Sequence, residues 1–266
     1  MLTLFDTHCH YAEARFQSPE GGREIEAARA AGLTRALVCA THPGDFEAVR
    51  TTAHRTGYTY ALGIHPMLVS NEAGIGRAIE RFDAALEVAR GDSLLAAIGE
   101  IGLDDWPGAA KISLAAQERL LEAMLARART FDLPVSIHSR KALSRVLSLL
   151  KRTPVRGVLH AFAGSPEEAK QSLKLGLKLG FGPSLTYSGS RRIREVFAAL
   201  PEDAFVLETD APFMLTAKAR RQGRTTASPA DIFEVLKAAA ELRGTSQEEI
   251  AARSTTNALA VFGRVK

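Results

Sequence analysis

The sequence predicts an α/β fold, a (β/α)8 TIM barrel formed by a single domain, 1–266. Eight short apolar runs alternate with longer segments of helical periodicity, and no linker or low-complexity stretch divides them. The runs are almost continuously apolar, which is typical of parallel strands with both faces buried. Eight strand–helix units without a break favour a closed barrel, and a doubly wound sheet is the weaker alternative.

The expected strands are short apolar runs. They cover 2–5, 34–40, 58–64, 93–102, 134–138, 155–160, 177–182 and 204–210. Glycines at 32, 57 and 176 stand just before three of them, where a preceding helix is expected to end. Each run therefore has the length and the boundary expected of a buried strand.

Between the strands, apolar residues recur at helical spacing. The expected helices cover 24–31, 78–89, 114–131, 142–150 and 166–175, and the tail adds 228–242 and 246–262. Start signals agree, because Ser113 precedes one helix and Ser165-Pro166 opens another with an N-cap residue and a proline.

The composition describes an ordinary globular protein, with 46% hydrophobic and 24% charged residues. Two cysteines are too few for a disulfide framework and suit a reducing compartment. The first 16 residues include Asp6, His8, His10 and Glu13 before an apolar signal could form, and no apolar run reaches a membrane span. We expect a cytoplasmic protein without a membrane partner or an obligate protein partner. A net charge of +4 hints at an anionic partner.

Histidines mark the ends of the expected strands. His8 and His10 follow the first strand, and their spacing places both side chains on one side with Cys9 on the other. An isolated His-x-His is most simply a polar turn, but three more histidines end other strands: His65, His138 and His160. In a barrel, the carboxyl ends of the strands meet at one mouth, so these imidazoles are expected to converge.

Carboxylates repeat this pattern. Glu100 ends the fourth strand, and Glu208 and Asp210 end the eighth, where their spacing predicts that both leave on one side. Six groups suit two divalent ions, Zn²⁺, Mg²⁺ or Mn²⁺, that share a bridging carboxylate, for which Glu100 is the natural candidate. The expected metal ligands are His8, His10, Glu100, His138, His160 and Asp210.

The motifs DTHCH, GIHP, GEIGLD, HSR, HAFAG and ETDAPF, in this order and spacing, resemble the TatD family of metal-dependent deoxyribonucleases. The resemblance covers essentially the whole chain. It implies a TIM-barrel hydrolase of the amidohydrolase superfamily that uses divalent metal to cleave phosphodiester bonds of DNA. It also implies that the six residues above are ligands and that His65 lies near the substrate phosphate.

Three departures from the family pattern are local. Met67 stands where the family commonly has a second histidine, and GLDDW replaces the more usual GLDY, which brings Trp106 near the mouth. The segment 227–229, Ala-Ser-Pro, replaces the usual Asn-x-Pro. The six expected ligands are intact, while the substrate preference is left open.

The expected activity is cleavage of DNA at single-stranded ends by a metal-activated water. Asp210 is the first candidate base, Glu208 the alternative, and His65 and Arg140 are candidate donors to the phosphate. For Arg140, a surface ion pair is the other interpretation. A deacylase or amidohydrolase acting on another ester or amide, and a non-catalytic barrel that binds nucleic acid, are the competing functions.

Aromatic and basic residues in the expected mouth loops extend this hypothesis. For each aromatic residue in these loops, packing in the core or at the rim is the favoured interpretation, and stacking on bases is the alternative for Tyr11, Trp106, Phe162, Tyr187 and Phe213. The basic residues expected in loops after strands seven and eight are Arg191, Arg192, Arg194, Lys218, Arg220, Arg221 and Arg224. They are expected to follow a nucleic-acid backbone, or else to form a solvated rim.

Overall fold

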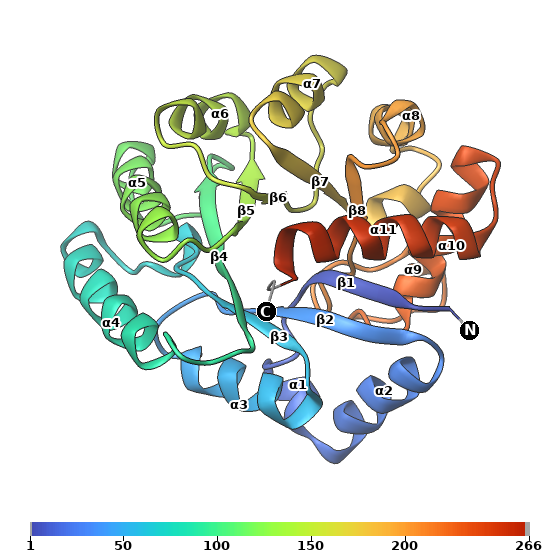
Figure 1. Ribbon diagram of the computed structural model, residues 1–266, viewed down its shortest axis with the longest axis horizontal. Helices are drawn as coiled ribbons and strands as arrows, with labels where there is room; N and C mark the ends of the chain where they lie inside the picture. The colour runs from blue at the N-terminus through green and yellow to red at the C-terminus, as the bar shows by residue number, and fades with distance from the viewer. Residues whose placement is uncertain (1, 264–266) are drawn as a thin grey trace.

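In the computed structural model, which describes residues 2–263, eight parallel strands form one sheet in the order of the sequence (Figure 1). The strands are β1 (Leu4–Cys9), β2 (Leu33–Cys39), β3 (Thr59–Leu62), β4 (Leu95–Asp104), β5 (Val135–Arg140), β6 (Gly157–Leu159), β7 (Leu177–Phe181) and β8 (Phe205–Leu207). All eight predicted strands are present, and the (β/α)8 barrel prediction is confirmed.

The barrel closes at a seam between β1 and the segment that follows β8. The backbone N–H of Asp210 donates to the carbonyl of His8 at 2.9 Å, and that of His10 donates to Ala211 at 2.8 Å. The Thr7 hydroxyl adds a bond to the carbonyl of Leu207. The closure therefore lies beside the residues for which the sequence predicts metal chemistry.

Helices surround the sheet (Figure 1). They are α1 (Ala14–Gln17), α2 (Pro19–Ala30), α3 (Phe46–Thr56), α4 (Ile75–Val88), α5 (Leu114–Thr130), α6 (Leu143–Arg152), α7 (Pro166–Lys174), α8 (Arg191–Ala199), α9 (Ala217–Arg221), α10 (Asp231–Arg243) and α11 (Gln247–Phe262). Short 3₁₀ turns cover η1 (Pro66–Leu68), η2 (Glu72–Gly74) and η3 (Pro183–Thr186). The second helix begins earlier than predicted because Ser18 accepts the Gly21 N–H as its N-cap.

The last helix fills the end of the barrel opposite the mouth. Ala258, Val261 and Phe262 of α11 pack with side chains inside the barrel, including Phe5 and Val206. Figure 1 shows α11 lying across β1 and β8. A substrate can therefore reach the inside of the barrel only from the opposite end, the mouth.

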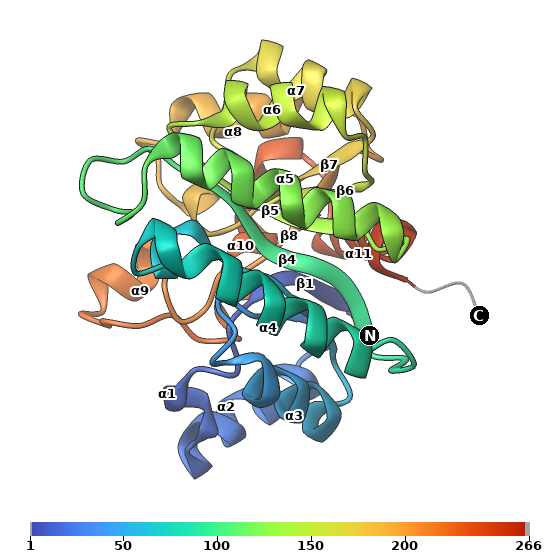
Figure 2. The ribbon, with the colours of Figure 1, turned by 90° about the vertical axis from the view of Figure 1, so that its left-hand side faces the viewer.

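The mouth lies where loops after the strands project. Figure 2 shows the loop between β4 and α5, together with α9, reaching out on the side away from α11. Three non-glycine residues with positive φ stand on this side, Lys141, Ala161 and Asp210, each following or ending a strand segment. A positive φ is uncommon in residues other than glycine, and residues with this conformation are concentrated at functional sites.

Three of the differences between predicted and observed strand ends concern the proposed site. The first strand continues to Cys9, so His8 lies within it, and β4 continues to Asp104, so Glu100 lies in its middle. The register of β4 against β5 shifts between Ile98 and Ile101, around Glu100. The eighth strand ends early at Leu207, because the chain turns there to bond with β1.

Within residues 2–263, no helix combines the length and the apolar character that crossing a membrane requires.

Candidate metal centre

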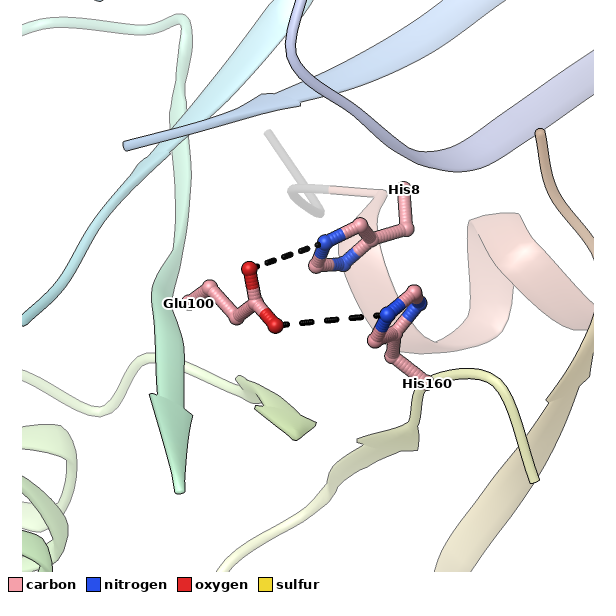
Figure 3. A group of neighbouring side chains, drawn as sticks. All are labelled: His8, Glu100 and His160. Atoms are coloured by element: carbon pink, nitrogen blue, oxygen red, sulfur yellow. Dashed lines mark ion pairs between the residues drawn. The ribbon is translucent and has the colours of Figure 1, made fainter. Parts of the chain in front are cut away.

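Side chains from distant strands converge on Glu100 in the middle of the mouth (Figure 3). His8 comes from β1 and His160 from the end of β6, and their rings stack with centroids 3.6 Å apart. Figure 3 shows the Glu100 carboxylate facing both rings, with His8 Nε2 3.4 Å from Oε2 and His160 Nε2 3.9 Å from Oε1. All three side chains are buried.

The two oxygens of Glu100 face different histidines, Oε2 two of them and Oε1 three, one of which is His65. Oε2 lies 3.4 Å from Nε2 of His8 and 3.4 Å from Nε2 of His10. Oε1 lies 3.3 Å from Nδ1 of His138 and 3.9 Å from Nε2 of His160. One carboxylate therefore stands between two sets of imidazole nitrogens, as a bridge between two cations would.

Asp210 joins the first of these sets. Its Oδ1 lies 3.3 Å from Nε2 of His10 and 3.9 Å from Nε2 of His8. Nitrogen and oxygen donors within this spacing can hold a metal ion, and the buried groups His8–His10–Asp210 and His8–Glu100–His160 both meet that condition.

In three of the histidines, the ring nitrogen that points away from the centre forms a hydrogen bond, and this bond determines which nitrogen faces the centre. His10 Nδ1 donates to the carbonyl of Cys39 at 3.0 Å, His160 Nδ1 to Glu208 at 2.9 Å, and His138 Nε2 to Asp104 at 3.0 Å. When these rings are neutral, the opposite nitrogens carry lone pairs that point at the centre. An imidazole held from behind by a carboxylate or carbonyl is the usual arrangement of a metal ligand.

Charge in the centre supports the same conclusion. Burial opposes protonation of His10, but Asp210 and Glu100 outweigh it and raise the pKa of His10 to about 10. Burial likewise opposes protonation of His160, and Glu208 and Asp210 raise its pKa to about 9. Although burial opposes ionisation of Glu100, the surrounding histidines hold its pKa well below the usual range. The carboxylates thus require positive charge among them, from protons or from a cation, and the donor set fits a divalent cation.

His65 differs from the other four histidines. Its Nδ1 accepts the backbone N–H of Met67 at 3.2 Å, so the proton of the neutral ring lies on Nε2. That nitrogen is 3.4 Å from Glu100 Oε1, and burial lowers the pKa of His65. His65 therefore faces the centre as a hydrogen-bond donor.

Glu208 stands behind His160. Its Oε1 accepts from His160 Nδ1 at 2.9 Å and from the backbone N–H of Ala161 at 2.6 Å. The strand spacing used to predict that Glu208 and Asp210 leave on one side does not apply, because the strand ends at Leu207 and Asp210 has a φ of +55°. Both carboxylates nevertheless contact histidines of the centre, Glu208 on His160 and Asp210 on His10.

Arg140 forms the ion pair that was the alternative interpretation. Its Nε lies 3.0 Å from Oδ1 and 2.9 Å from Oδ2 of Asp104. Asp104 is buried, and although burial opposes its ionisation, His138 and Arg140 lower its pKa to about 2. The rest of the guanidinium remains at the surface, since 42% of the Arg140 side chain is exposed.

Sequence reasoning did not identify Asp6. This buried carboxylate accepts hydrogen bonds from the backbone N–H groups of His8 and Thr209 and from the Thr209 hydroxyl and Tyr11 phenol. Its position two residues before His8 was the available signal, because side chains two apart share a face. Cys9 points away from the centre as predicted, with its thiol on the Leu37 carbonyl.

For two of the stacking candidates, the favoured interpretation of core packing is confirmed. Tyr11 and Phe162 are buried, where the Tyr11 phenol donates to Asp6 and Phe162 packs on Phe181. Trp106 and Phe213 are exposed at the mouth, and Tyr187 is partly buried.

Several predicted phosphate-binding cations have other partners. Arg224 makes a two-point ion pair with Asp231, and Lys218 pairs with Glu234. Arg192 and Arg194 donate to backbone carbonyls of residues 163 and 185, and with Arg191 they belong to α8 rather than to a loop. The chain turns into a helix after Ser190, so the loop is shorter than predicted.

Comparison with known proteins agrees with the fold and with a metal-dependent hydrolase. The model of the family "TatD related DNase" matches residues 5–263. The uncharacterized metal-dependent hydrolase YjjV of Escherichia coli K12 is 34% identical over 262 residues, 97% of each chain, and the crystal structure of this TatD homologue superposes with a TM-score of 0.88 over 98% of each chain at 32% identity. A protein of Klebsiella pneumoniae named 3'-5' ssDNA/RNA exonuclease TatD is 30% identical over 266 residues, 98% of each chain. The chain therefore belongs to the TatD-related DNase family of metal-dependent hydrolases.

Proposed function

We propose that the protein hydrolyses phosphodiester bonds of DNA, as an exonuclease on single-stranded ends, with two divalent ions bound at the mouth. The observation that carries this proposal is the Glu100 carboxylate, whose Oε2 faces His8 and His10 while its Oε1 faces His138 and His160, with the donor His65 beside them. A single tetrahedral ion would leave several of these donors without a role.

The donors divide into two sets. His8, His10 and Asp210 would hold one ion, His138 and His160 the other, and Glu100 would bridge them. Imidazole and carboxylate together suit Zn²⁺ or Mn²⁺, and Mg²⁺ is the oxygen-preferring alternative. Bound divalent ions lower the pKa of water and neutralise negative charge on a phosphate under attack.

The chain's own side chains would then orient the phosphate and move protons. His65 has a hydrogen on Nε2 aimed at the centre, which suits donation to a phosphate oxygen. Asp210, at the edge of the cluster, is the proposed proton acceptor. Glu208 and Asp104 would act through His160 and His138, whose rings they orient.

Three facts support nucleic acid as the substrate. One relative is named an ssDNA/RNA exonuclease, and a human relative that is 30% identical over 275 residues is named deoxyribonuclease TATDN3. Exposed arginines, Arg220 and Arg221, lie on α9 at the mouth. A phosphodiester backbone matches both the cationic rim and a two-ion centre.

The test is hydrolysis by protein loaded with Zn²⁺, Mn²⁺ or Mg²⁺ in parallel. With end-labelled single-stranded DNA and RNA, we expect products that shorten progressively, more than one ion per chain by elemental analysis, and reversible loss of activity on chelation. Hydrolysis of a carboxylic ester but of no oligonucleotide would favour the deacylase alternative. Oligonucleotide binding without turnover under any metal would favour the non-catalytic barrel.

Two substitutions separate metal binding from turnover in that assay. Glu100→Gln should weaken occupancy of both ions, because a neutral amide bridges cations poorly. Asp210→Asn should mainly lower kcat, by about 100-fold or more, if its main role is proton transfer. His54→Ala is the matched control, because His54 lies on α3 and pairs with Asp92 away from the mouth. Parental activity in both site variants would mean that the site is misassigned.

A further inference from the structure

The single tryptophan of the chain is exposed beside the metal centre. Among residues 2–263, five large apolar side chains are exposed, and three of them lie in loops at the mouth: Leu68, Trp106 and Phe213. Trp106 is 50% exposed, and a large aromatic side chain left in water at a site entrance marks a binding surface.

Trp106 is tied to the centre through one carboxylate. Its backbone N–H donates to Asp104 Oδ1 at 3.0 Å, and Asp104 Oδ2 accepts from Nε2 of the proposed ligand His138 at 3.0 Å. The start of the loop that carries the indole is therefore held directly against the metal-binding shell.

Two cationic side chains lie near the indole ring of Trp106. The Arg140 guanidinium carbon lies 5.4 Å from the ring centroid, and Lys141 Nζ lies 5.8 Å from it. Asp104 holds Arg140 in this place through Nε, while Nη2 approaches the Met67 sulfur at 3.9 Å. Lys141 has a φ of +60°, an uncommon backbone for a lysine.

An aromatic face with adjoining cations suits a nucleotide. A base stacks on the ring whatever its identity, and the guanidinium and ammonium groups attract the phosphate attached to it. A peptide or lipid partner would call for a wider apolar surface, whereas the side chains found against the indole are charged.

We propose that Trp106 stacks on the nucleobase next to the scissile phosphate, with Arg140 and Lys141 binding the adjoining backbone phosphate. This inference rests on the proposed function, of which it names a substrate-binding residue. In GLDDW, Asp105 stands at the position of the tyrosine in GLDY, and Trp106 follows it, so this chain carries an indole one residue further along the same loop.

Tryptophan fluorescence tests the contact without turnover. Because Trp106 is the only tryptophan, the signal reports on this residue alone. We expect saturable quenching of the metal-loaded protein by a phosphorothioate oligothymidylate, which resists hydrolysis, and little change with an abasic oligomer of the same length and charge. Equal responses to both oligomers, or no response to an oligothymidylate shown to bind by competition, would overturn the proposal.

Kinetics supply the second readout. Trp106→Ala should raise KM for oligothymidylate by about 5- to 100-fold with kcat nearly unchanged, and Trp106→Phe should raise it much less. A substrate that lacks the base beside the cleaved bond should be insensitive to both. Val88→Ala is the matched control, an exposed apolar residue at the end of α4.

The two proposals fail differently. If the metal-loaded parent hydrolyses oligonucleotides and Trp106→Ala keeps the parental KM, only the stacking inference is wrong. If the parent hydrolyses no oligonucleotide with any of the three metals, the proposed function is wrong, and the stacking inference falls with it.

Discussion

Asp6 connects the closure of the barrel to the proposed metal centre. Its carboxylate accepts four hydrogen bonds, two of them from Thr209, which lies between Glu208 and Asp210. Burial raises the pKa of Asp6 to about 7 although these donors oppose the shift. A single residue of β1 thus holds the segment that carries two of the proposed functional carboxylates.

Asp6→Ala is expected to lower the free energy of unfolding by about 3 kcal/mol or more, because buried donors lose their acceptor. Asp6→Asn should cost much less, since the amide oxygen can accept the two N–H groups and the amide nitrogen can donate to the Thr209 and Tyr11 hydroxyls. Urea denaturation at pH 7 in chelator measures both values. Thr7→Val, which removes one bond across the same seam, is the control and should cost about 1 kcal/mol. A loss below about 1 kcal/mol in Asp6→Ala would contradict the role given to this residue.

At the scale of the strand, a glycine makes room for a carboxylate. A Cβ added to Gly180 of β7 would lie 2.9 Å from the carboxyl carbon of Glu208, closer than real Cβ atoms come to other atoms. Glu208 must approach β7 this closely in order to accept from His160. The absence of a side chain at Gly180 is therefore part of how His160 is oriented.

Gly180→Ala is expected to displace the Glu208 carboxylate from His160 Nδ1 and to weaken metal binding about 10- to 100-fold, the usual effect of losing a group that orients a ligand. Competition against a fluorescent chelator gives the affinity, and thermal unfolding shows whether the barrel persists. Gly189→Ala is the matched control, because a Cβ there meets no atom within 4 Å and the residue lacks a positive φ. Wild-type affinity in Gly180→Ala would remove Glu208 from the site.

A structural feature can be predicted from the sequence when the residues that determine it lie close together in the chain. Most strands and helices were predicted with small errors at their ends, because burial leaves a local pattern, although α3 and α8 were not among the expected helices. The barrel topology then brought His8, Glu100 and His160 together. The roles of Asp6 and Glu208 could not be read in this way. Asp6 meets Thr209 across 203 positions, and Glu208 meets His160 across 48, so neither contact leaves a periodic signal.

Short-range pairing also escaped prediction where the chain is irregular. Arg224 was expected to face substrate, but it binds Asp231 seven residues later, at the start of α10. Nothing in the residue pattern distinguishes such an arginine from a surface one, because the turn between them decides whether the two groups meet. Arg140 also pairs with a carboxylate, but there the partner, Asp104, lies opposite it on the neighbouring strand β4.

Across the whole molecule, charge is arranged in two zones. Carboxylates gather inside the mouth, where bound cations would neutralise them, while the net charge of the chain is +4. On α9, Arg220 lies over the Tyr187 ring at 5.9 Å, and neither Arg220 nor Arg221 pairs with a carboxylate in the part of the chain that the structure describes. Figure 2 shows α9 projecting on the same side as the loop that carries Trp106.

The α9 arginines are expected to bind the backbone of a nucleic-acid strand beyond the cleaved bond. Replacing Arg220 and Arg221 together with Ser should raise KM for oligonucleotides, leave kcat nearly unchanged, and flatten the logarithmic salt dependence of binding by about 0.7 for each phosphate that the variant no longer neutralises. Arg152→Ser with Arg156→Ser removes the same charge on α6 and just before β6, from arginines that pair with Glu122 and Asp132, and is the matched control. A dinucleotide, too short to reach α9, should be cleaved alike by all three proteins. If the α9 double variant keeps the parental salt slope with long oligonucleotides, α9 does not touch the substrate.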